Sequence, residues 1–119
     1  MPSSKVPRRL RDIVDNARAA ARYTEGMDAA AFRDNRLVYD AVERCLERVC
    51  EAAAKLGDMA VYLMPDQPWR KVRALGNVLR HEYDAVEEAR LFEIVRDDLP
   101  RLAAAAEEAL RRWERAEDA

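Results

Sequence analysis

One stretch of the sequence constrains the fold more than any other, a long run of regularly spaced apolar residues. These residues recur every three or four positions, which is the period of a helix with one buried face; they are Val38, Val42, Cys45 or Leu46, Val49, Ala52 or Ala53, and Leu56. Asp34 or Asn35 can cap the start of this helix, and Gly57 is the residue type that commonly follows a helix end. The sequence therefore predicts a helix of roughly 20 residues ending at about Leu56.

The rest of the composition favours further helices that cover this apolar face. Half of the 119 residues are hydrophobic, 37% are charged, and only three are glycine, a balance typical of helical domains. The last helix is expected to be capped by Asp97 or Asp98, with Pro100 in its first turn. The other predicted helical segments are 8–23, 29–33, a helix from Pro68 to Tyr83 or Asp84, and 89–96.

The intervening segments are expected to be less regular. Residues 1–7 resemble a loose arm because Pro2 and Pro7 resist regular structure, and the tail beyond Arg115 is expected to fray. A packed loop or a short helical turn is predicted for residues 57–67, and an acidic connector is predicted for residues 82–88. We expect a single all-α domain spanning residues 1–119, folded as a small antiparallel helical bundle.

Several classes of function are excluded or disfavoured by the same sequence. No apolar run approaches the roughly 18 residues of a membrane span, and the polar, basic N-terminus does not resemble a secretory signal, so a cytoplasmic protein is expected. Cys45 and Cys50 would point roughly 140° apart on one helix, which favours two small buried thiols over a disulfide. With a single histidine and no paired Cys-x-x-Cys, neither a metal nor another cofactor is expected.

The chemistry that the sequence does offer is concentrated in residues 69–83. Arg73, Asn77, Arg80 and His81 fall on one stripe of the predicted helix, because residues three and four apart are neighbours on its surface. A cation, an amide and an imidazole arranged in this way can bind a phosphate and move its protons. The alternative is a solvated polar face that happens to include the histidine. The net charge is only −2, so any RNA would be bound locally rather than by the whole surface.

Five motifs also resemble a known family. In chain order they are Arg11-Asp12-Ile13, residues 51–56 at the end of the long helix, Pro68-Trp69-Arg70, residues 75–83, and residues 92–100. The Pro-Trp-Arg start, the Asn-x-x-x-His-x-Tyr core and the Asp-Leu-Pro end are quite specific in combination. They resemble the HepT-like branch of the HEPN superfamily, and the resemblance extends from about residue 8 to residue 112.

The resemblance implies an all-helical bundle that dimerises and acts as a metal-independent ribonuclease toxin of a type VII-like toxin–antitoxin pair. The implied antitoxin is a minimal nucleotidyltransferase, encoded beside the toxin, that silences it by adding AMP to a tyrosine. The family signature is an arginine, four residues, a histidine, one residue and that tyrosine, and the arginine and histidine form the catalytic pair. His81 and Tyr83 match this signature, and so does Asn77, which we expect to position RNA or phosphate.

The arginine of the signature is missing, because Gly76 occupies its position five residues before His81. One hypothesis is a displaced catalytic arginine, with Arg80 favoured over Arg73. Arg80 lies one helical turn after Gly76, and its long side chain can reach the place where the side chain of residue 76 is missing. The alternative is a catalytically weakened HEPN-fold module that keeps the fold and docks a nucleotidyltransferase partner. The sequence leaves both interpretations open.

Overall fold

The predicted long helix is α3 (Arg36–Leu56), and its two ends are set as the sequence indicates. In this computed structural model, residues 2–81 and 87–118 are described, with side chains from Lys5 onward. The Asn35 side-chain oxygen accepts a hydrogen bond from the Val38 amide at 3.1 Å, so Asn35 rather than Asp34 caps α3. Gly57 has a φ of 58°, a left-handed value that favours glycine, and its amide donates to the carbonyls of Ala53 and Ala54.

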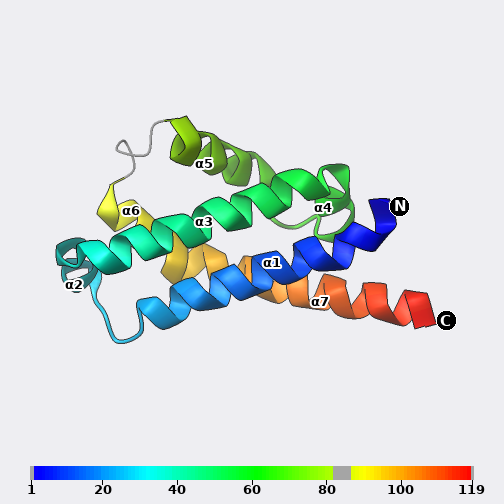
Figure 1. Cartoon of the computed structure of the whole chain (residues 1–119), viewed down its shortest axis with the longest axis horizontal. Coiled ribbons are helices and arrows are strands. Elements are labelled where there is room, and N and C mark those ends of the chain that lie inside the picture. Colours follow the sequence, from blue (N-terminus) through cyan, green and yellow to red (C-terminus); the bar gives the residue numbers. More distant parts are fainter. Residues whose placement is uncertain (1, 82–86, 119) are drawn as a thin grey trace.

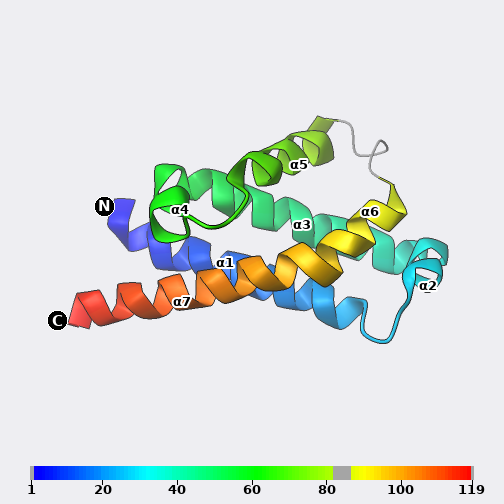
Figure 2. The same ribbon diagram turned by 180° about the vertical axis from the view of Figure 1, so that it is seen from behind.

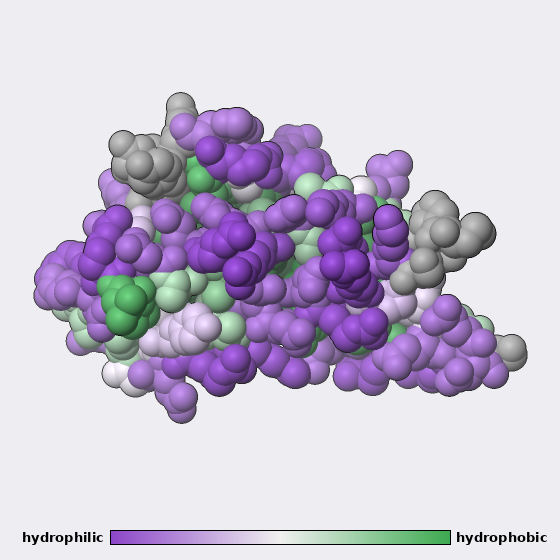
Figure 3. All heavy atoms as spheres, in the orientation of Figure 1, coloured by the Kyte–Doolittle hydropathy of each residue, from purple (hydrophilic) through white to green (hydrophobic). Residues whose placement is uncertain are grey.

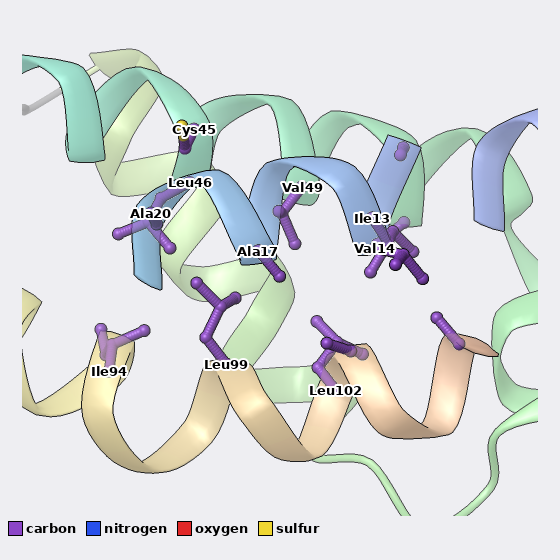
Figure 4. Close-up of a cluster of buried hydrophobic side chains, with 14 of the residues drawn as sticks. Ile13, Val14, Ala17, Ala20, Cys45, Leu46, Val49, Ile94, Leu99 and Leu102 are labelled. Carbon is purple, nitrogen blue, oxygen red and sulfur yellow. The ribbon is translucent and has the colours of Figure 1, made fainter. Parts of the chain in front are cut away.

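Three long helices form the body of the molecule. α1 (Pro2–Tyr23) packs against α3 on one side and α7 (Leu99–Asp118) on the other, and the three lie side by side (Figures 1 and 2). Their facing side chains form one apolar core (Figure 4), which includes Ile13, Val14, Ala17, Ala20, Leu46, Val49, Leu99 and Leu102. The described chain contains helices and no strand, which confirms the predicted all-α bundle.

The C-terminal part of the bundle differs from the prediction. α6 (Glu88–Glu93), the π-helical turn η2 (Ile94–Asp98) and α7 follow one another without a break, so the expected new helix capped by Asp97 or Asp98 is wrong. The amide of Leu99 donates to the carbonyl of Ile94, five residues earlier. Pro100 has no amide hydrogen and its ring would crowd the carbonyl four residues before it. The wider turn just before Pro100 accommodates that clash within a continuous helix.

The N-terminal helix is also longer than predicted. α1 begins at Pro2 and contains Pro7, whereas the sequence indicated a start near Arg8. Val6 is buried in the core, and this packing holds the first turns in place. The two short helices are closer to the prediction: α2 (Ala29–Asp34) is capped by the Asp28 side chain, and α4 (Asp58–Leu63) is the short helical turn expected between residues 57 and 67.

α5 (Trp69–His81) carries the candidate site and lies against α3, on the opposite side of α3 from α1 (Figures 1 and 2). Its start is fixed by Trp69, whose side chain is buried and whose Nε1 donates to the Met64 carbonyl at 2.8 Å. Near its end, Leu79 is buried. The predicted end of this helix, at Tyr83 or Asp84, lies outside the described residues.

Candidate functional site

α5 has one buried face and one exposed polar face. Trp69, Gly76 and Leu79 are its buried residues. The four predicted polar residues are all exposed; they are Arg73, Asn77, Arg80 and His81. The polar stripe predicted from the sequence therefore lies on the surface of α5, and His81 is the last described residue of the helix.

The exposed face of α5 is strongly cationic. Residues 69–81 contain Arg70, Lys71, Arg73 and Arg80 and no acidic residue. Within the described part of the chain, none of these four side chains forms an ion pair. Figure 3 shows hydrophilic side chains over this helix. Cations without neighbouring acids attract an anionic ligand such as a phosphate backbone.

The Arg80 side chain turns back over Gly76, a residue of α5 that lies close to Cys50 of α3. A Cβ atom placed on Gly76 would lie 3.0 Å from the Cβ of Cys50, 3.6 Å from its Sγ, and 3.5 Å from Nη1 of Arg80. The Cys50 thiol in turn donates to the Val72 carbonyl at 3.7 Å. The guanidinium of Arg80 thus lies beside the place that a side chain at position 76 would occupy.

The structure brings together only part of the predicted site. The Arg80 guanidinium lies beside Gly76, whereas Arg73 is exposed at an earlier position of α5. Tyr83 lies outside the described residues. The sequence correctly predicted Cys50 as a buried thiol, but it did not reveal the contact of Cys50 with Gly76 and Arg80. The available signal was a glycine inside a periodic helix, which often marks the close approach of another backbone.

A groove of about 920 Å³ lies beside α5, and Lys71 of the cationic face is among the residues that line it. Its floor is apolar, and the residues that form it include Leu46, Val49, Val72, Leu75, Val78, Ile94, Leu99 and Leu102. Its edges carry charges of both signs, which are Asp66, Glu87 and Asp98 against Lys71, Arg90 and Arg101. An apolar floor with a mixed polar rim is typical of a surface that binds another protein.

The described residues contain neither a cluster of potential metal ligands nor a helix that could cross a membrane. No group of three or more histidine, cysteine or acidic side chains in this part of the chain could hold a metal ion. Likewise, none of the described helices is long and apolar enough to cross a membrane.

The thiol of Cys50 makes the α3–α5 contact sensitive to alkaline pH. Burial raises the pKa of this thiol to about 11, although the positive charge of Arg80 opposes the rise. The ordinary value is 9.0, so the folded protein holds this proton more tightly than the unfolded chain does. The resulting stability is complete below pH 9 and is lost as the pH rises through about 11, with a maximum of about 2–3 kcal/mol.

We therefore expect the free energy of unfolding of the wild type to fall between about pH 9 and 11, as measured by urea denaturation. Cys50→Ala should show a shallower fall over this range. Cys45→Ala is the comparison variant, which keeps the Cys50 thiol and removes the Cys45 thiol, whose pKa burial also raises. Equal slopes for the wild type and Cys50→Ala would contradict the tight packing of this thiol.

Comparison with known proteins assigns the family. The sequence profile of the family described as "Ribonuclease HepT-like" matches residues 13–109. A Methanocaldococcus jannaschii protein named "Putative RNase MJ1380" is 30% identical over 93 residues, which cover 78% of this chain and 85% of that protein. A Thermococcus cleftensis protein named "Probable ribonuclease HepT" is 28% identical over 93 residues, with coverage of 78% and 84%. No solved structure matches the chain. Because the profile matches well over half of its length, this chain belongs to the HepT-like ribonuclease family.

Proposed function

We propose that this protein is a metal-independent endoribonuclease that acts as the toxin of a type VII-like toxin–antitoxin pair in the cytoplasm. One observation supports this proposal above the others: the exposed face of α5 combines Arg73, Asn77, Arg80 and His81 with no acidic neighbour within the helix. Such a face can hold an RNA phosphate and supplies both a proton acceptor and cations at the same place. The described residues provide no alternative ligand set for a metal.

The proposed reaction uses the 2′-hydroxyl of RNA as its nucleophile. His81 accepts the proton of the 2′-hydroxyl as the 2′-oxygen attacks the adjacent phosphorus. The bond to the 5′-oxygen breaks and this oxygen takes a proton from water, while protonated His81 returns its proton to the solvent, so the products are a 2′,3′-cyclic phosphate and a 5′-hydroxyl. Arg80 stabilises the additional negative charge of the pentacoordinate phosphorus, while Asn77 and Arg73 position the phosphate.

We favour Arg80 over Arg73 as the arginine that replaces the missing one of the family signature. The basis is the short separation between its Nη1 and the place where a Cβ of residue 76 would lie. Arg80 is also adjacent in sequence to His81, so the cation and the base share the end of α5. Arg73 lies two turns earlier on the same exposed face and is better placed to contact a neighbouring phosphate.

We further propose that the protein works as a homodimer. One histidine per chain supplies only one imidazole for acid–base catalysis. A two-fold axis beside α5 would bring a second His81 into a shared cleft. The groove beside α5 supports this arrangement, because Val72, Leu75 and Val78 are only partly buried along it and its rim carries equal numbers of acidic and basic side chains. Such a balanced rim is compatible with a self-complementary contact.

The proposed antitoxin is a minimal nucleotidyltransferase that adds AMP to Tyr83. In co-expression with this partner, we expect intact-mass spectrometry to show addition of AMP to the wild type and none to Tyr83→Phe. Because phenylalanine keeps the ring without the hydroxyl, Tyr83→Phe should remain toxic in the presence of the partner. Silenced wild-type protein without added AMP would instead indicate inhibition by binding alone.

The alternative function is a catalytically weakened module that docks a nucleotidyltransferase, and Gly76 at the arginine position is the feature that favours it. Growth arrest on expression without the partner separates the two functions, since only an active nuclease should arrest growth. We expect arrest by the wild type and none by His81→Ala at equal protein levels. Normal growth with both proteins would favour the docking module.

A further inference from the structure

The contact around Gly76 has a consequence for the function proposed above. The Cβ of Cys50 is attached directly to the α3 backbone, so it cannot move aside without moving that helix. It would lie only 3.0 Å from a Cβ on Gly76, which is closer than ordinary van der Waals contact between carbon atoms. The absence of a side chain at position 76 is therefore what allows α5 to lie this close to α3.

The same absence makes room for the Arg80 guanidinium. Arg80 is four residues after Gly76 and lies on the same side of α5. Its Nη1 would be 3.5 Å from a Cβ on Gly76, an ordinary van der Waals contact, so an alanine would touch the guanidinium and a longer side chain that extends in this direction would displace it. Position 76 and the Arg80 head group thus compete for one space.

We infer that Gly76 is a positioning residue for Arg80, and that its missing side chain creates the space in which the Arg80 guanidinium lies beside Cys50. The inference rests on the proposed ribonuclease function, in which Arg80 stabilises the charge on phosphorus. Glycine at position 76 is then an adaptation to Arg80 as the catalytic arginine rather than a sign that RNA cleavage has been lost. Restoring an arginine at position 76 should harm the enzyme, because the long side chain would displace α5 or Arg80.

The test is a set of substitutions at position 76, made both in the wild type and in Arg80→Ala. Gly76→Ala should lower kcat for RNA cleavage several-fold, and Gly76→Val should lower it by about 10²-fold with little change in KM, since misplacement of a catalytic group by about 1 Å has effects of that size. In the Arg80→Ala background, the same changes should lower the residual kcat less than about two-fold, because the group that they displace is absent. Gly76→Arg should also lower kcat and should not rescue Arg80→Ala.

Two outcomes would overturn the inference. Equal losses in both backgrounds would show that Gly76 acts only on the packing of α5, and an increase in cleavage by Gly76→Arg would show that the site lacks an arginine. Thermal unfolding of every variant identifies those that fail to fold. If Gly76→Val is among them, the comparison of Gly76→Ala between the two backgrounds decides the question.

A readout that does not depend on cleavage separates this inference from the proposed function. In side-chain NMR of the wild type, the Arg80 guanidinium protons should show a nuclear Overhauser effect to the Gly76 α-protons, and in Gly76→Val the Arg80 Nε–Hε resonance should shift. A protein with these signals but without RNA cleavage would refute the nuclease and keep the placement of Arg80. Cleavage that depends on Arg80, together with wild-type activity in Gly76→Val, would keep the nuclease and refute the role of Gly76.

Discussion

Arg80→Ala should lower the kcat of RNA cleavage by about 10²–10³-fold, the range observed when one group that stabilises transition-state charge is removed. Arg80 is expected to act mainly in the transition state, so KM should change much less than kcat. The matched control is Arg73→Ala, which removes the same charge from the same exposed face of α5. Because Arg73 is proposed to contact a neighbouring phosphate, its loss should mainly raise KM.

His81→Ala should have an effect similar to that of Arg80→Ala, since general-base catalysis by a side chain contributes about 10²–10⁴-fold. The double variant should be little worse than the worse single variant, because the two groups act on one reaction step. Measurement of kcat and KM with a defined RNA oligonucleotide checks both expectations. If Arg73→Ala lost the larger share of kcat while Arg80→Ala stayed near the wild type, the assignment of the displaced arginine would be wrong.

Trp69→Ala should destabilise the fold by about 3–5 kcal/mol, the range for removal of a large buried aromatic side chain. Trp69 is 7% exposed and begins the helix that carries the site. Its hydrogen bond to the Met64 carbonyl also fixes the connection between α4 and α5. Alanine would leave a cavity and would remove one of the two hydrogen bonds that the Met64 carbonyl accepts, the other coming from the Gln67 amide.

Urea denaturation of Trp69→Ala and Trp69→Phe separates these two contributions. Phenylalanine keeps much of the apolar volume but lacks the indole N–H, so Trp69→Phe should lose only about 1–3 kcal/mol. The exposed Tyr62 is a suitable control, and Tyr62→Ala should change the free energy of unfolding by less than about 0.5 kcal/mol. A cost below 1 kcal/mol for Trp69→Ala would contradict the role of this side chain in anchoring α5.

The sequence was sufficient to predict elements whose signals are local. α3 has an apolar repeat along its whole length, a capping side chain at Asn35 and a glycine just past its end, so its existence and its limits followed from the pattern. The polar stripe of α5 was predictable for the same reason, because helical spacing alone decides which residues share a face. Both predictions depend on neighbours within four residues and need no knowledge of the rest of the chain.

The features that escaped prediction depend on contacts between distant segments or on a competition between local rules. Pro100 indicated the start of a helix, but packing of α6 and α7 keeps the helix continuous. The π-helical turn before Pro100 avoids the clash of the proline ring with the preceding turn. Pro7 lies within α1 because Val6 is buried in the core. The contact between Gly76 and Cys50 joins residues of two helices, and no periodicity within either helix reveals how closely the two approach.

The most direct test of the central claim is to identify the ends that the purified wild-type protein leaves on RNA in the presence of EDTA. Attack by the 2′-hydroxyl requires no metal and produces a 2′,3′-cyclic phosphate and a 5′-hydroxyl, which mass spectrometry distinguishes from other ends. A substrate with a single 2′-deoxy nucleotide at the cleavage position should remain intact. The account predicts cyclic phosphate ends from wild-type protein and none from His81→Ala. Cleavage of the deoxy substrate, or activity abolished by EDTA, would contradict it.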